Sequence, residues 1–369
     1  MATYYIDSLI GMPDNDGKTE ISPLDTHVGL DIKPGDTVLF RRGTSYRQPI
    51  VYNGCDGKSV TFGAYGNGDA PVFFGSVNRS ERYLWAQTDK VNVWKLAIPL
   101  SSSPCNMIFD FGDHCGAHAW SCDELSVQGQ WWSDHAGNGS SLYMYSEESP
   151  GSYYRDIEVA LDVESMISAD KNAVFDGLCI MCAGRNGALL SSAENVHIKD
   201  CRFEFIGGVV YDAENKIRCG NGAELVGSNV NCSVEDCIFH NIYDSSIKMN
   251  GGDGVSKNIT LYGNTFDKYG MAALEIEGNV GENVLFELNV CLGAGHGFSL
   301  GGEKQPRRSK IYPIPTGYHV LADHIKNTEG SSLTVRRNIF RGRPTGDNFR
   351  ISEDNIEAKS RIIFENNEF

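Results

Sequence analysis

The segment VEDCIF, which runs from Val234 to Phe239, decides the fold because its pattern recurs five more times in the chain. The pattern is an apolar residue, two variable positions, Asn or Cys, one further residue and usually Phe. Internal repeats with periods of about 20 to 50 residues indicate solenoids, propellers or arrays. The other copies are IKDCRF (Ile198 to Phe203), LYGNTF (Leu261 to Phe266), FELNVC (Phe286 to Cys291), VRRNIF (Val335 to Phe340) and FENNEF (Phe364 to Phe369).

The repeating units have the composition of strands and turns. They are rich in Val, Ile, Phe and Thr, in short alternating runs that end at Gly, Asn or Asp. The closest copies start 25 residues apart, whereas a propeller blade takes about 40 to 45 residues. We therefore predict a single-stranded, right-handed parallel β-helix, an all-β solenoid whose coils lie about 4.8 Å apart. Phe side chains are expected to stack in its core, and Asn side chains to hydrogen-bond along its axis at one turn.

The charge of the chain limits its partners. The 369 residues carry a formal net charge of −16, which argues against nucleic acid and anionic membrane surfaces, because both reward clustered Lys and Arg. No stretch of about 18 apolar residues is present, so no transmembrane helix is expected. We predict an oligosaccharide or polysaccharide partner, no nucleic acid and no membrane.

The cysteines and the N-terminus bear on the compartment. Three of the eleven cysteines, Cys201, Cys237 and Cys291, occupy ladder positions, where packing favours a small apolar side chain. Many free thiols would put a secreted solenoid at risk of oxidation. The opening MATYYIDSLIG has neither the basic nor the apolar region of a signal peptide. We expect a cytoplasmic protein for the chain as given, or a secreted one if a signal peptide was removed.

Two N-terminal segments resemble a known group of proteins. YYIDSLIGMPDNDG (Tyr4 to Gly17) and KPGDTVLFRRG (Lys33 to Gly43) are similar to the first coils of bacterial β-helix proteins that act on carbohydrates. The later GNGAEL, YDSSI and ALEIEG segments also look like coils of those proteins. The resemblance implies the β-helix fold and leaves the substrate open, because such proteins include glycoside hydrolases, polysaccharide lyases, epimerases and proteins of no known activity.

The repeats divide the chain into three parts. We expect an N-terminal capping segment and the first coils in residues 1–100, an inserted Trp-rich wing in 101–154 and the main coils in 155–369. A long loop insertion is predicted at 303–330, and loops of this length are uncommon unless they are functional. The chain stops at Phe369 on a ladder position, so an unpaired coil edge there would favour homo-oligomerisation.

A second alignment, on the strand after each turn, predicts a polar column. The aligned segments are AELVG, IKMNG, LEIEG, FSLGG and FRISE, with apolar first and third residues that point inward. Their second residues must then point outward. That column consists of Glu224, Lys248, Glu275, Ser299 and Arg350.

The column suggests paired carboxylates. Glycoside hydrolysis needs two carboxyl groups, about 5 to 9.5 Å apart, that flank one bond, and adjacent coils offer about 5 Å. We predict Glu224, Asp244 and Glu275 as the catalytic residues of a glycoside hydrolase. The expected substrate-binding residues are Lys248, Glu277, His296, Arg307, Arg308 and Trp131.

Alternatives remain at this stage. A polysaccharide lyase would use Lys248, His296 or the arginines as its base, and a non-catalytic glycan-binding or adhesion module would use the column only for docking. The column is also compatible with an ordinary solvated strand face. The spacing of His114, His118 and Cys122 matches no strong zinc signature, so no metal and no cofactor is predicted.

Overall fold

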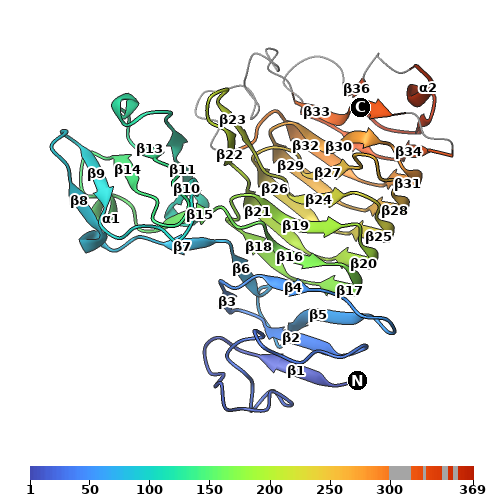
Figure 1. Cartoon of the computed structure of the whole chain (residues 1–369), viewed down its shortest axis with the longest axis horizontal. Helices are drawn as coiled ribbons and strands as arrows, with labels where there is room; N and C mark the ends of the chain where they lie inside the picture. The colour runs from blue at the N-terminus through green and yellow to red at the C-terminus, as the bar shows by residue number, and fades with distance from the viewer. Residues whose placement is uncertain (299–316, 327–329, 343–347, 352–355) are drawn as a thin grey trace.

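The main body of the computed structural model is a parallel β-helix, described over residues 1–298, 317–326, 330–342, 348–351 and 356–369 (Figure 1). Three parallel sheets run along the solenoid, and a complete coil contributes one strand to each sheet. Along the chain, a strand of the first sheet precedes one of the second, which precedes one of the third. The two α-helices in the described ranges, α1 (Pro150–Tyr153) and α2 (Ile356–Lys359), are too short to cross a membrane.

The sheets are named here by their order within a coil. The first sheet consists of β1 (Thr3–Ile6), β2 (Thr37–Arg41), β5 (Val60–Tyr65), β17 (Lys171–Asp176), β20 (Glu194–Lys199), β25 (Val230–Glu235), β28 (Lys257–Tyr262), β31 (Glu282–Glu287), β34 (Leu333–Arg336) and β37 (Ile362–Glu365). The second sheet consists of β3 (Ser45–Tyr46), β6 (Val72–Phe74), β18 (Cys179–Met181), β21 (Arg202–Ile206), β26 (Ile238–Ile242), β29 (Thr265–Tyr269), β32 (Val290–Ala294) and β35 (Ile339–Phe340). The third sheet consists of β4 (Ile50–Tyr52), β16 (Ser165–Ala169), β19 (Asn186–Ser191), β24 (Ala223–Val226), β27 (Ile247–Asn250), β30 (Ala272–Asn279), β33 (Tyr318–Lys326) and β36 (Phe349–Ile351).

A smaller body, here called the wing, leaves the solenoid after β6 and returns before β16 (Figure 1). Its strands run from Ser76 to Leu161 and so extend beyond residues 101–154 on both sides. One wing sheet contains β7 (Ser76–Asn78), β10 (Pro104–Phe109), β11 (His114–Cys115) and β15 (Ile157–Leu161). The other contains β8 (Trp85–Gln87), β9 (Val93–Leu96), β12 (Ala117–His118), β13 (Gln130–Ser133) and β14 (Leu142–Tyr145). The wing has its own apolar core, which includes Trp131.

The predicted amide ladder lies at the turn between the first and second sheets. The Asn289 side-chain oxygen accepts hydrogen bonds from the backbone N–H of Asn264 at 2.9 Å and from its side-chain amide at 3.0 Å. Asn338 and Asn367 continue the same arrangement in later coils. Cys237 precedes Asn264 in the ladder, because its backbone N–H donates to the Asn264 side-chain oxygen. The register read from the repeat is therefore confirmed.

A second asparagine ladder was not predicted from the sequence. Asn195, Asn231, Asn258 and Asn283 occupy the second position of successive first-sheet strands, and each side-chain amide donates to the side chain of the previous coil, with Asn195 bonded to Asn172. All five have φ between 50° and 55°, in the left-handed region that Asn tolerates well. This second ladder could have been predicted from the Asn at the second position of five segments: KNAV, ENVH, VNCS, KNIT and ENVL.

We expect the inner ladder to contribute more to stability than the outer one. Asn289 is fully buried and also donates to the Leu261 carbonyl at 3.0 Å. Its replacement in Asn289→Ala leaves several buried polar groups unpaired, at a cost of about 1 to 3 kcal/mol each before relaxation. Denaturant unfolding should show a loss of at least about 2 kcal/mol. The control, Asn258→Gly in the exposed ladder, accepts the left-handed backbone of this position and should lose less than about 1 kcal/mol, and equal losses would contradict this assignment.

All eleven cysteines are free thiols, and seven of them are buried. Burial raises the pKa of Cys291 well above its ordinary value, which keeps the thiol protonated and unreactive. We expect a thiol titration under denaturing, non-reducing conditions to find close to eleven thiols per chain. Recovery of one thiol or none would contradict the burial of reduced cysteines at the ladder positions.

Candidate functional site

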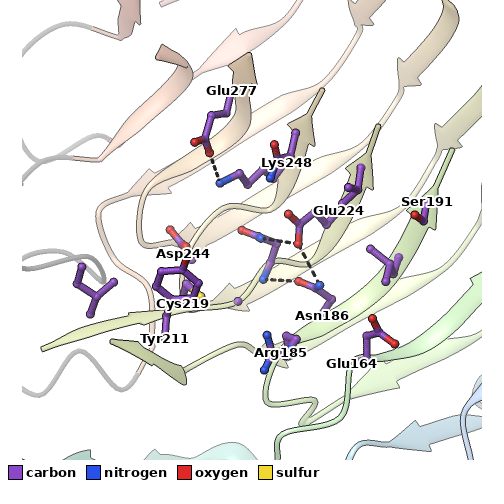
Figure 2. Close-up of a pocket in the computed structure, with 16 residues that line it drawn as sticks. Glu164, Arg185, Asn186, Ser191, Tyr211, Cys219, Glu224, Asp244, Lys248 and Glu277 are labelled. Atoms are coloured by element: carbon purple, nitrogen blue, oxygen red, sulfur yellow. Dashed lines mark hydrogen bonds and ion pairs between the residues drawn. The ribbon is translucent and has the colours of Figure 1, made fainter. Parts of the chain in front are cut away.

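A cleft of about 570 Å³ lies on the outer face of the third sheet, beside a hairpin formed by β22 (Val209–Asp212) and β23 (Ile217–Cys219) (Figure 2). Sites of roughly 300 to 1,000 Å³ commonly hold small ligands. The cleft is lined by Glu164, Arg185, Asn186, Leu189, Ser191, Tyr211, Ile217, Cys219, Gly220, Asn221, Glu224, Val226, Asp244, Lys248, Asn250 and Glu277.

Strand register brings part of the predicted column together. Glu224 on β24 lies beside Lys248 on β27, which lies beside Glu275 on β30. Outward-pointing side chains of neighbouring parallel strands are about 4.8 Å apart. The alternation of inward and outward residues therefore predicted the correct register for Glu224, Lys248 and Glu275.

The fourth member of the predicted column is wrong. Ser299 lies outside the described residues, and the strand that follows β30 is β33, which places Leu321 beside Glu275. Arg350 on β36 then follows Leu321 in the same column. The strand β33 also occupies part of the predicted loop insertion at 303–330. The segment YHVLADHIK offers the same apolar alternation as FSLGG, with Val320 and Ala322 buried.

Lys248 is held by two glutamates. Its Nζ lies 2.6 Å from Glu277 Oε2 and 3.4 Å from Glu275 Oε1. The Lys248 side chain is 10% exposed, whereas that of Glu277 is 41% exposed. The ammonium therefore sits between one buried and one half-exposed carboxylate, and only Glu277 and Lys248 of these three line the cleft.

Glu275, one of the predicted catalytic residues, does not line the cleft. It is 2% exposed, and its Oε2 accepts a hydrogen bond from Ser245 Oγ at 2.5 Å. Leu321, its neighbour in the column, is also buried, at 3% exposed, whereas Arg350, the next member of the column, is exposed. Alternation along a strand fixed the direction of Glu275, but tertiary packing decided its burial.

Glu224 lines the cleft, and two side-chain amides donate hydrogen bonds to its carboxylate. Its Oε2 accepts hydrogen bonds from the Asn186 amide at 3.0 Å and the Asn221 amide at 3.4 Å (Figure 2). Asn186 lies on β19, the neighbouring strand of the sheet. The two amides fix the orientation of the carboxylate, and Glu224 remains partly exposed.

Asp244 lies in the turn before β27 and lines the same cleft. The backbone carbonyl of Asp244 accepts hydrogen bonds from the backbone N–H of Gly270 at 3.0 Å and of Met271 at 2.9 Å. The residue is fully buried. The cleft thus combines a partly exposed carboxyl, Glu224, with a buried carboxyl, Asp244, from the next coil.

Four other predicted site residues are not placed in the cleft. Trp131 is fully buried in the wing core and cannot offer a ring face to a sugar. His296 lies exposed in a turn after β32 and does not line the cleft, because β33 rather than the segment around His296 continues the third sheet. Arg307 and Arg308 lie outside the described residues.

Several cleft residues were missed by the sequence reasoning. Arg185 precedes β19 and donates from Nε and Nη2 to the Asp162 carboxylate at 2.8 and 3.0 Å, which raises the pKa of Arg185. Tyr211 lies on β22 and is 74% exposed. The available signal was VVYDAENKIRC, two apolar runs around a polar turn, which is typical of a hairpin.

The side-chain inventory favours acid–base chemistry with carboxyl groups. Both cations of the cleft, Arg185 and Lys248, are engaged by carboxylates. Within the described ranges, no group of three or more His, Cys, Asp or Glu is arranged to hold a metal ion. The carboxyl groups that line the cleft are those of Glu164, Glu224, Asp244 and Glu277.

The described part of the chain is a parallel β-helix with a polar cleft on one outer sheet face. No protein-family profile and no curated protein matches the sequence. The chain is similar in structure to a protein described as a glycoside hydrolase, with 11% identity, a TM-score of 0.55 and coverage of 100% of this chain and 97% of that chain. It is also similar to XylC, solved in complex with xylose, with 12% identity, a TM-score of 0.57 and coverage of 99% and 62%. The three parallel sheets and the order of their strands along the chain confirm the predicted right-handed parallel β-helix.

Proposed function

We propose that the chain is a carbohydrate-active enzyme, and specifically a glycoside hydrolase that acts in the cleft on the third sheet. The observation that carries the proposal is the presence of Glu224 and Asp244, on consecutive coils, in one cleft. The structural likeness to a glycoside hydrolase supports it only by analogy of fold.

The two carboxyl groups have environments suited to different roles. Asp244 is fully buried at the cleft wall, and it is assigned as the general acid that protonates the leaving oxygen. Glu224 is partly exposed and oriented by two amides, so it is assigned as the carboxylate that acts as base or nucleophile.

Of the bases predicted for a polysaccharide lyase, Lys248 is the one that lines this cleft among the residues that the structure describes. A lyase base must be unprotonated to remove the proton beside a uronate carboxylate. The ammonium of Lys248 lies between Glu277 and Glu275, so both carboxylates already engage the nitrogen that would act as the base. This pairing supports hydrolysis over elimination.

A glycan panel tests the proposal. Purified protein is incubated with neutral and uronate-containing polysaccharides, and the assay follows both new reducing ends and the ultraviolet absorbance of unsaturated uronates. New reducing ends without that absorbance are expected. Appearance of the absorbance would show a lyase, and binding without product would show a glycan-binding module.

A further inference from the structure

Tyr211 is an exposed aromatic ring at the wall of the cleft. It lies on β22 of the hairpin and is 74% exposed, although it lines the cleft. Figure 2 shows Tyr211 and Cys219 on the hairpin side, with Glu224 and Lys248 on the sheet side. A tyrosine ring combines a flat apolar face with a polar tip, which suits it to contact the C–H face of a sugar ring.

A two-stranded hairpin is marginally stable by itself, so its position depends on how its base is held. Arg218 on β23 is 2% exposed. It donates from Nε to the Gly208 carbonyl at 2.9 Å, and from Nη2 to the Cys105 carbonyl at 2.5 Å and Asn106 Oδ1 at 2.7 Å. Cys105 and Asn106 belong to β10 of the wing. Arg218 therefore joins the hairpin to the wing.

Aromatic and amide contacts complete this junction. The Arg218 guanidinium lies 4.6 Å from the ring centroid of Tyr243 and 5.8 Å from that of Trp131, within the range of cation–π contacts. The Asn106 amide donates to the Gly207 carbonyl at 2.6 Å. The wing thus contacts both the start of the hairpin, at Gly207, and its second strand, at Arg218.

The two glycines at the start of the hairpin permit this close approach. Gly207 and Gly208 have φ of 106° and 105°, a conformation that strains other residues. A Cβ at Gly208 would collide with the Asn106 amide, and one at Gly207 would lie 2.8 Å from Tyr243 Cβ. Backbone conformation and packing therefore fix the hairpin in one place against the wing.

We propose that Tyr211 is a sugar-stacking platform that sets substrate specificity, and that Arg218 is its positioning residue, acting through the hairpin that it fastens to the wing. This inference rests on the proposed function for its choice of ligand. It assigns the wing a role in binding, because the wing supplies the acceptors that hold the hairpin.

Calorimetric titration with xylohexaose, cellohexaose and mannohexaose tests the platform. The full chain carries Glu224→Gln, so that the probes are not consumed. We expect at least one probe to bind, and Tyr211→Ala to weaken that binding about tenfold, while Tyr211→Phe stays within about twofold because the ring is kept. Tyr83→Ala, at an equally exposed tyrosine of the wing, is the matched control. Failure of all three probes to bind, or unchanged affinity in Tyr211→Ala, would overturn the proposal.

A double-mutant cycle tests the positioning role. Arg218→Lys cannot reproduce the forked contacts of arginine, so we expect it to weaken binding as Tyr211→Ala does, and the combined variant to show no further loss. Losses in affinity that add in the combined variant would show that Arg218 does not act through Tyr211 and would overturn the inference, whatever the melting temperature. If Arg218→Lys does not fold, Asn106→Ala, which removes the facing acceptor, replaces it in the same cycle.

The two proposals fail separately. If the unmodified chain releases reducing ends but its affinity for the probes does not depend on Tyr211, the platform proposal is wrong and the hydrolase proposal stands. If the affinity depends on Tyr211 but no product forms, the hydrolase proposal is wrong and the platform proposal stands.

Discussion

Glu224→Gln should lower kcat by roughly 100-fold or more on whichever glycan the chain cleaves, since a positioned acid or base contributes about 10²- to 10⁴-fold. The amide cannot accept a proton or attack an anomeric carbon, but it keeps the shape of the carboxylate. Asp244→Asn should cause a loss of similar size, because the proposed mechanism needs both carboxyl groups. Initial rates of reducing-end release, with KM and kcat separated, provide the measurement.

The matched control is Glu235→Gln. Glu235 lies on β25 in the first sheet and does not line the cleft, so the same chemical change there should leave kcat within about twofold, as expected for a substitution outside the site. Melting temperatures of all three variants separate loss of catalysis from loss of folding. An active hydrolase that retains its kcat in both Glu224→Gln and Asp244→Asn would place the chemistry outside this cleft.

The sequence predicted the parts of the site that follow from local alternation and repeat register. Glu224 and Lys248 could be aligned because AELVG and IKMNG share buried first and third residues. Period-two alternation specifies only the face of a strand. It does not specify what covers that face, so the burial of Glu275 beside Ser245 was not predictable.

The misplaced fourth member of the column, Ser299, shows a second limit. Both FSLGG and YHVLADHIK carry alternating apolar residues, and the length of a loop between coils is only weakly constrained energetically. The pattern alone therefore could not choose between Ser299 and Leu321 as the neighbour of Glu275. The hairpin with Tyr211 was missed for a related reason. It is an insertion between two strands of one coil, so its sequence does not carry the repeat pattern.

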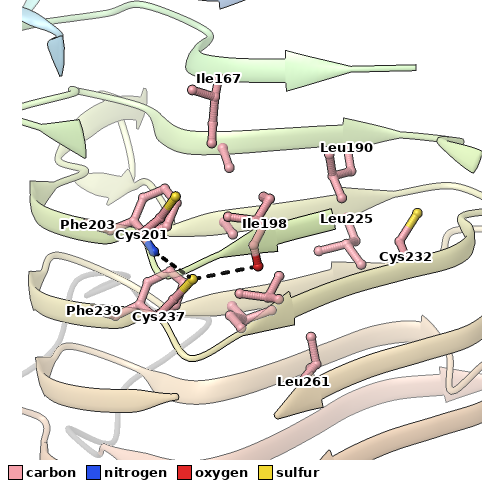
Figure 3. Close-up of a cluster of buried hydrophobic side chains, with 14 of the residues drawn as sticks. Ile167, Leu190, Ile198, Cys201, Phe203, Leu225, Cys232, Cys237, Phe239 and Leu261 are labelled. Atoms are coloured by element: carbon pink, nitrogen blue, oxygen red, sulfur yellow. Dashed lines mark hydrogen bonds between the residues drawn. The ribbon is translucent and has the colours of Figure 1, made fainter. Parts of the chain in front are cut away.

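The core, by contrast, follows from the repeat, and its largest test is Phe239→Ala. Phe239 is fully buried between two equivalent residues, with its ring centroid 4.7 Å from that of Phe203 and 5.2 Å from that of Phe266. The three rings stack on one another in consecutive coils (Figure 3 shows the first two). Removing the middle ring leaves a cavity that rigid strands on either side cannot close.

We expect Phe239→Ala to lower the free energy of unfolding by about 3 to 5 kcal/mol, as for other buried aromatic residues. Ile238→Ala, at the neighbouring residue of the same strand, is the control: Ile238 is 41% exposed, and its replacement should cost less than about 1 kcal/mol. Denaturant unfolding with a common slope for all variants measures both values. Because each coil is stabilised mainly by its neighbours, the loss should also appear as faster hydrogen exchange in β21 and β29. A cost of Phe239→Ala no larger than that of Ile238→Ala would mean that the stacked rings do not form the core.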